Sequence, residues 1–226
     1  MKREKVPARA PQVVWQREER TLTLDGEPVL AYSLSWPQVT GAGIGGRWIS
    51  RYYGRLARAW RQRWQRELYL KACLSLADRR AVSRPFTPWS CRLAGEVTLC
   101  RDGLLSLRLE GEEARGDGKA SRVRWGDVWK AREGAPCPPG ELFPKKRGWK
   151  RALLTQIVSQ GRARQQAGDW FPDPDWEQRL RRSLPVDGLC LTEEGVEVSF
   201  PQCSIAPALE GTPVFVVPRD NDTPKL

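Results

Sequence analysis

Four arginines stand at regular intervals in the first third of the chain. Arg47, Arg51, Arg55 and Arg58 follow one another in steps of four, four and three residues. This spacing places them along one side of an α-helix, where their guanidinium groups can bind carboxylates or phosphates by paired hydrogen bonds. Aromatic residues alternate with arginines in the stretch RYYGRLARAWRQRWQREL, residues 51–68. Arginines and aromatic rings on one exposed face are typical of surfaces that bind nucleic acid.

The apolar residues of the same stretch follow a second stripe. Its members are Ile49, Tyr53, Leu56, Trp60, Trp64 and Leu68. At about 100° per residue the two stripes lie roughly 180° apart, and only Trp48 and Tyr52 fall outside the apolar one. We therefore favour a scaffold helix whose apolar side packs on a sheet and whose arginine side is a basic, candidate ligand-binding surface. A nucleic-acid-binding helix that uses the arginine face is the alternative.

A second group of residues that could do chemistry is acidic: Asp169, Asp173, Asp175 and Glu177. Their spacing is not that of an EF-hand loop, and two prolines interrupt it. We expect Asp173 or Asp175 to cap a short helix that begins near Trp176. We predict no metal site and no cofactor, and a carboxylate-based activity is the weaker alternative.

The composition narrows the function further. The chain of 226 residues contains no His, which excludes Ser-His-Asp, Cys-His and HExxH arrangements. We therefore expect no catalytic residues and no enzyme. The 38 Lys and Arg against 27 Asp and Glu give a formal net charge of +11, which favours anionic partners.

The cysteine spacing and the hydropathy of the chain indicate the cellular compartment in which we expect the protein. None of the six cysteines forms a CxxC pair, and we expect free, mostly buried thiols rather than disulfides. The charged first residues lead into no apolar segment, and no run of 18 apolar residues occurs. As written, the sequence predicts no signal peptide, no membrane span and a cytoplasmic protein.

The elements that must position these residues form an α+β pattern. Strand-like segments and helices are mixed without a βαβα rhythm, which predicts an antiparallel sheet packed against one long and one or two shorter helices. Glycines in residues 40–46 predict a flexible loop before the long helix. The expected divisions are a disordered N-terminus at 1–11, a module at 12–131 with the long helix at 47–77, a Pro/Gly-rich loop at 132–148, a second module at 149–218 packed on the first, and a tail at 219–226.

The stretch LCLTEEGVEVSFPQCSIAPALEGTPVFVVP, residues 189–218, resembles the signature of the RsiV-like family of extracytoplasmic domains. The matching positions that we assign a structural role are Gly195, Phe200, Ile205, Ala206, Pro207 and Gly211. Weaker similarities upstream follow the same order, so the resemblance covers nearly the whole chain. A Gly-Gly-Ala-His loop that is common in the family reads EEARGDGKAS here.

The resemblance implies an α+β fold and a bacterial binding or sensing module. In the anti-sigma factor that gives the family its name, this region lies outside the membrane and binds lysozyme, and similar modules accompany cell-wall deacetylases such as PdaC. Lysozymes are typically basic, and a chain of net charge +11 repels them, so we do not expect lysozyme as the partner. We expect an unknown protein or an anionic ligand, with nucleic acid less favoured.

Overall fold

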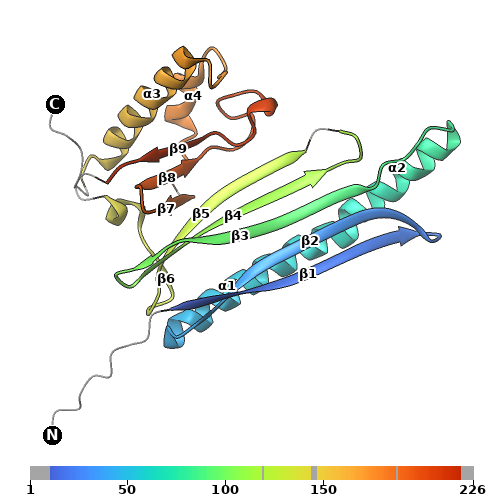
Figure 1. Ribbon diagram of the computed structural model, residues 1–226, viewed down its shortest axis with the longest axis horizontal. Coiled ribbons are helices and arrows are strands. Elements are labelled where there is room, and N and C mark those ends of the chain that lie inside the picture. Colours follow the sequence, from blue (N-terminus) through green and yellow to red (C-terminus); the bar gives the residue numbers. More distant parts are fainter. Residues whose placement is uncertain (1–10, 119, 144–146, 187, 220–226) are drawn as a thin grey trace, which may run out of the picture. The chain divides into compact units, whose positions relative to one another are not determined.

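The computed structural model describes residues 11–118, 120–143, 147–186 and 188–219. It has the predicted mixture of strands and helices, with a six-stranded sheet in the order β1-β2-β3-β4-β5-β6 and a three-stranded sheet in the order β7-β8-β9 (Figure 1). The residues expected to be disordered at 1–11 and to form a tail at 219–226 lie, except for Pro11 and Arg219, outside the described part.

The chain divides into two compact units that are not consecutive segments. Unit 1 contains the described residues up to Gly95, together with 110–121 and 131–134. Unit 2 contains residues 96–109 and 122–130, together with the described residues from Ala135 onward. The modules expected from the sequence were consecutive, whereas the hairpin strands in the middle of the chain are shared between the two units.

Unit 1 begins with a long hairpin of β1 (Gln12–Leu24) and β2 (Glu27–Thr40). These strands pair in antiparallel fashion along their whole length. The turn between them is Asp25-Gly26, with φ angles of 53° and 83°, which is the backbone that an Asp-Gly pair favours in a two-residue hairpin loop.

A helix of 39 residues follows the hairpin. It consists of α1 (Gly43–Gln62), a π-helical segment η1 (Arg63–Leu68) and α2 (Tyr69–Ala81). The chain then returns in β3 (Trp89–Arg101), whose first residues pair with β2 in parallel. The expectation of an antiparallel sheet is wrong for this pair, because a long helix carries the chain back so that β3 runs in the direction of β2.

The helix begins earlier than predicted, and residues 40–46 are not a flexible loop. Gly45 and Gly46 are buried, and a Cβ atom on Gly45 would lie 2.2 Å from the carbonyl oxygen of Ala131. The Ser50 hydroxyl accepts a hydrogen bond from the Val39 amide at 2.8 Å and donates one to the Gly46 carbonyl at 2.8 Å. These glycines serve close backbone packing, which fixes the direction in which the helix leaves the hairpin.

The π-helical segment keeps one side of the long helix buried. The buried side chains include Ile49, Tyr53, Trp64, Leu68 and Leu76. A step of four residues on an α-helix turns the next side chain by about 40° too far, so the stripe would drift away from the sheet. In η1 the Tyr69 amide bonds to the Trp64 carbonyl five residues back, and this wider turn offsets the drift.

The other elements continue the six-stranded sheet or belong to unit 2. They are β4 (Leu104–Ala114), β5 (Ser121–Lys130), β6 (Ala135–Pro136), η2 (Pro139–Leu142), α3 (Trp149–Ala167), α4 (Trp176–Arg182), β7 (Leu189–Leu191), β8 (Val196–Ser199), η3 (Ala208–Glu210) and β9 (Val214–Val217). The predicted loop at 132–148 thus contains a two-residue strand and a short 3₁₀ helix. One or two shorter helices were expected, and two are present as α3 and α4.

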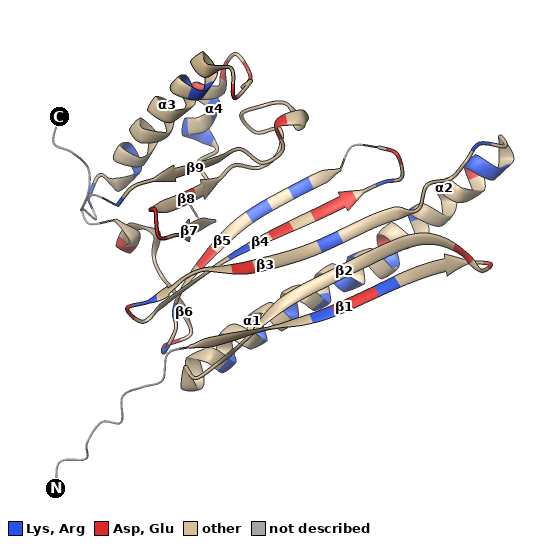
Figure 2. Cartoon of the chain, in the orientation of Figure 1, with Lys and Arg blue, Asp and Glu red and all other residues tan. Residues whose placement is uncertain are grey.

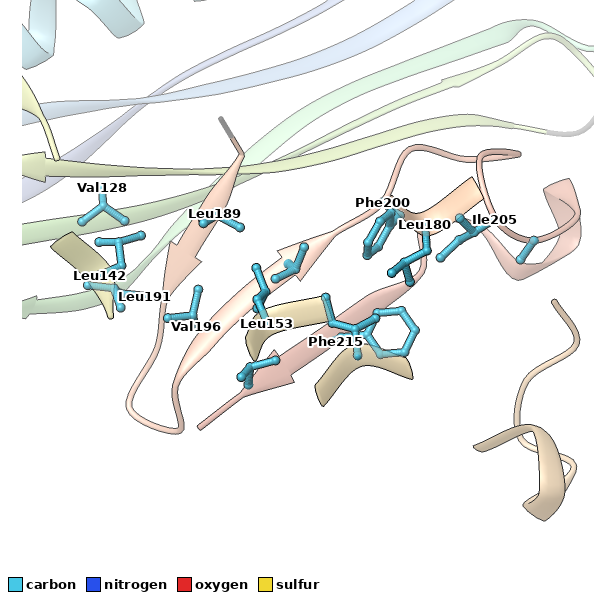
Figure 3. Close-up of a cluster of buried hydrophobic side chains, with 14 of the residues drawn as sticks. Val128, Leu142, Leu153, Leu180, Leu189, Leu191, Val196, Phe200, Ile205 and Phe215 are labelled. Carbon is cyan, nitrogen blue, oxygen red and sulfur yellow. The ribbon is translucent and has the colours of Figure 1, made fainter. Parts of the chain in front are cut away.

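The core of unit 2 lies between α3, α4 and the small antiparallel sheet (Figure 3). Its centre is aromatic, since the ring of Phe215 meets Phe200 edge-on at 5.9 Å and Trp170 at 5.5 Å. All three side chains are at most 1% exposed. Burying a side chain of this size contributes about 1.5–3 kcal/mol, so this cluster is a principal source of stability for unit 2.

Candidate functional site

The arginine stripe lies on the exposed side of α1. Arg47, Arg51, Arg55 and Arg58 are all exposed, and Figure 2 shows basic residues along this helix. The predicted side of the helix is therefore correct, whereas binding by these residues stays a prediction.

Arginines further along the helix differ in their pairing. Arg61 binds Glu18 through Nε at 3.1 Å and through Nη2 at 2.5 Å. Arg63 binds Glu113 through Nε at 2.8 Å and through Nη2 at 2.9 Å. In the described part of the chain, no carboxylate lies within 4.0 Å of the guanidinium groups of the four stripe arginines. Their charge is therefore not neutralised within unit 1.

Exposed apolar side chains accompany the stripe. Ile44, Trp48 and Tyr52 follow one another in steps of four and are 63%, 53% and 43% exposed. The Arg51 guanidinium carbon lies 5.7 Å from the ring centre of Trp48, within cation–π range. At 100° per residue, Trp48 points about 20° from Arg55 and about 60° from Arg51. Two aromatic rings thus share the face of the arginines, although the larger aromatic stripe is on the buried side.

A shallow hollow marks the beginning of this face. It has a volume of about 450 Å³ and is lined by Ile44, Arg47, Trp48 and Arg51. Apolar surface, two cations and one indole ring at one place can bind the edge of an anionic ligand that also has a flat or apolar part. We call the exposed arginines together with Ile44, Trp48 and Tyr52 the α1 face.

Beneath the long helix, the structure contains a buried carboxylate that the sequence reasoning missed. Glu113 is 6% exposed and accepts hydrogen bonds from Arg63 and from the Trp64 indole nitrogen, the latter at 3.1 Å. Burial raises the pKa of Glu113, but these hydrogen bonds and the Arg63 charge outweigh burial and lower it below its usual value. Burial, with the nearby Glu113 charge, raises the pKa of the Cys91 thiol to about 12, so this thiol is a poor nucleophile.

A second buried carboxylate lies in unit 2. Glu197 in β8 is 3% exposed. It binds Arg108 at 2.7 Å and both Nε and Nη2 of Arg124, at 3.1 and 2.9 Å. Strand alternation in VEVS places Glu197 and Ser199 on the opposite side from the two valines, which predicts exposure, but both sides of β8 are buried. Both buried carboxylates are held by arginine and serve structure.

Three of the four residues in the predicted acidic cluster form ion pairs with arginine. Arg179 binds Asp173 at 2.7 Å and Asp175 at 2.9 Å. Asp175 occupies the position before α4, but its side chain makes no capping hydrogen bond, so the predicted cap is wrong. Hydrogen bonds from Arg162 lower the pKa of Glu177. Within the described ranges, no group of three or more potential metal ligands comes together.

The cysteines and the signature residues have structural surroundings. No disulfide joins the six cysteines, all of which belong to the described residues. Phe200, Ile205 and Ala206 are fully buried, whereas Pro207 is exposed at the start of η3. A Cβ atom on Gly195 would lie 2.2 Å from the Val217 carbonyl oxygen, which explains the glycine in the β7–β8 turn. Gly211 has a φ of 66°, which also favours glycine.

Comparison with solved structures places this architecture among known folds. A crystal structure of a DUF3298 family member from Bacteroides fragilis matches with a TM-score of 0.65 and 12% identity over 93% of this chain and 91% of that chain. A DUF3298 family protein from Pseudomonas aeruginosa PAO1 matches with a TM-score of 0.56 and 13% identity over 93% and 90%. The chain shares their fold. At this identity, the likeness shows the fold alone.

No family model matches the chain, and no curated protein matches it. Among the helices of the described residues, none has the length and apolarity needed to cross a membrane.

Proposed function

We propose that the protein is a non-catalytic binding or sensing module of the RsiV-like type, and that the α1 face binds an anionic ligand or an acidic protein surface. The observation that carries this proposal is the contrast along one helix. Arg61 and Arg63 bind carboxylates of the chain itself, whereas Arg47, Arg51, Arg55 and Arg58 are exposed and have none within reach in the described residues.

Three further features support this proposal. The net charge of +11 attracts anionic partners at long range. The buried glycines and the Ser50 hydrogen bonds hold the first turn of α1 in place, so the arginines are presented by a rigid element. The absence of His from the sequence and the arginine-bound carboxylates favour binding over catalysis.

Poly-L-glutamate is a suitable first probe, because it offers carboxylates along an extended chain. We expect fluorescence anisotropy to show binding that weakens as salt rises. Replacing the four stripe arginines with glutamine should reduce the affinity at least tenfold, which is about 1.4 kcal/mol. The matched control replaces four exposed arginines elsewhere in unit 1: Arg17, Arg66, Arg84 and Arg92. Equal losses in both variants would mean that only net charge matters, and would refute a specific face.

The second candidate is binding of single-stranded nucleic acid on the same face. It is favoured by Trp48 and Tyr52, whose exposed rings stand among the arginines and could stack with bases. Stacking contributes about 1–3 kcal/mol per base, so Trp48→Ala should weaken binding of an oligothymidylate more than binding of poly-L-glutamate. Equal effects on the two probes, or no binding of the oligonucleotide at 50 mM salt, would exclude this candidate.

A further inference from the structure

Unit 2 contains a groove that is separate from the α1 face. It has a volume of about 1070 Å³ and is lined by α3 from Lys150 to Gln166 and by Glu177 and Arg181 of α4. The 16 residue steps along α3 correspond to about 24 Å of helix. The groove is therefore long enough to hold an extended or helical segment rather than a compact small molecule.

The floor of this groove is apolar and continuous with the core of unit 2. Leu154 and Val158 are partly buried and pack against the core cluster. Ala163, five residues after Val158, contributes a small exposed side chain to the lining. Leu154 and Val158 are four residues apart, which matches the spacing by which one helix packs on another.

The rim is basic. Lys150, Arg151, Arg162 and Arg181 line the groove, and Glu177 is its single acidic residue. Arg162 already binds both oxygens of Glu177, at 2.8 and 2.9 Å. This pair leaves the other three cations to attract a ligand.

None of these three cations forms an ion pair with a described carboxylate, although Arg181 lies near enough to Glu177 for its charge to help lower the pKa of that carboxyl. Within the described part of the chain, no carboxylate lies within 4.0 Å of the charged groups of Lys150, Arg151 or Arg181. Lys150 and Arg151 also occupy the first turn of α3, which contains no acidic residue. The helix dipole disfavours positive charge at this end, so an acidic group bound there would be stabilised by the side chains and by the helix.

The distribution of charge decides the class of ligand. Lys150 and Arg162 are 12 positions apart, or about 18 Å along α3, so a single anionic head group cannot reach both ends. A wholly hydrophilic polyanion would leave the Leu154–Val158 floor exposed to water. We propose that the groove docks an amphipathic helix of a partner protein, with apolar residues on the floor and Asp or Glu residues against the basic rim.

Three synthetic 18-residue peptides test this proposal, with binding measured by fluorescence anisotropy on the full chain. The first has Leu at helical spacing and Glu on the remaining face, the second has Lys in place of Glu, and the third is the first peptide scrambled to remove the apolar face. We expect saturable binding of the acidic amphipathic peptide only. Failure of this peptide to bind, or equal binding of the Lys peptide, would overturn the proposal.

Variants locate the binding to the groove. Arg151→Glu and Arg181→Glu should each weaken binding of the acidic peptide by about tenfold, because each places a negative charge against the ligand. Arg182→Glu is the matched control, since Arg182 is the neighbouring exposed arginine on α4 and does not line the groove. Ala163→Glu places a negative charge in the lining at an exposed position and should also weaken binding of the acidic peptide.

The four-arginine variant of α1 separates this inference from the proposed function. If it abolishes peptide binding while the groove variants do not, the peptide binds the α1 face and the groove proposal is wrong. If the scrambled peptide binds as well as the first, the rim is only a general anion surface and the proposal is also wrong.

Discussion

Replacing Glu113 with glutamine tests the reasoning about buried charge in unit 1. The substitution keeps the shape of the side chain and removes its charge. The amide oxygen can take the Oε1 position and still accept hydrogen bonds from Arg63 Nε and the Trp64 indole nitrogen, but the amide NH₂ group then faces Arg63 Nη2, which is also a donor. The hydrogen bond from Arg63 Nη2, at 2.9 Å, is therefore lost, and the one from Arg63 Nε, at 2.8 Å, is weakened because its acceptor is no longer charged.

The size of the effect follows from exposure. Hydrogen bonds to charged groups contribute about 1.5–3 kcal/mol. The Arg63 side chain is 42% exposed and regains water when its partner changes, so we expect a loss of about 2 kcal/mol for Glu113→Gln. Glu113→Ala should cost about 1 kcal/mol more, because the fully buried Trp64 indole nitrogen then has no acceptor in that position.

Urea unfolding followed by tryptophan fluorescence measures this loss. The control is Glu67→Gln, which removes a carboxylate bound to the same guanidinium at 3.2 Å but 61% exposed. It should change the free energy of unfolding by less than about 0.5 kcal/mol. Equal effects of the two substitutions would refute the argument that burial gives the Glu113 pair its strength.

The same carboxylate predicts a dependence on pH. The pKa of Glu113 is lowered in the folded protein, so its contribution is complete above the unfolded value of about 4.3 and disappears as the pH falls through the folded value. The wild type should therefore lose more stability than Glu113→Gln between pH 5 and pH 3, as read from midpoints of urea unfolding. Parallel curves for both proteins would contradict this.

Three other outcomes follow from the packing. Gly195→Ala should destabilise unit 2 by on the order of 2–4 kcal/mol in urea unfolding, because its Cβ atom would meet a backbone carbonyl of β9 at 2.2 Å. Phe215→Ala should reduce the free energy of unfolding by about 3–5 kcal/mol and lower the thermal midpoint accordingly. Phe171→Ala should have little effect on either quantity, since Phe171 is 66% exposed. Ellman's reagent at pH 8 should react quickly with the exposed Cys203, and with Cys91 only after unfolding, because Cys91 is buried and its pKa is raised to about 12.

Much of the fold could be predicted from local patterns. The Asp-Gly pairs at residues 25–26 and 102–103 mark both long hairpin turns, and the apolar spacing marks the three main helices. These signals depend only on residues that are close together in the sequence, so a single sequence is enough to detect them. The parallel pairing of β2 with β3 depends on where a 39-residue helix ends relative to the sheet, and no local pattern records that.

The candidate sites also divide into features that local sequence patterns predict and features that depend on residues distant in the sequence. The exposed arginines of α1 were predicted because helical spacing alone separates them from the buried stripe. Glu113 and Glu197 were missed, because a carboxylate in a strand is ordinarily exposed. Its burial is possible here only because arginines that are distant in the sequence compensate the buried charge. The groove along α3 was missed because it also needs Glu177 and Arg181 of α4, which follow α3 after an irregular segment.

The division of the chain into interleaved units has a consequence for synthesis and for dissection of the protein. Unit 1 includes residues 131–134, so it cannot be completed on the ribosome until the chain has passed through two segments that belong to unit 2. The β1–β2 hairpin and the long helix are therefore synthesised before the later segments of unit 1 on which they pack. Expression of residues 1–95 alone should give a chain whose apolar helix side lacks part of its sheet, and coexpression with the remainder should restore it.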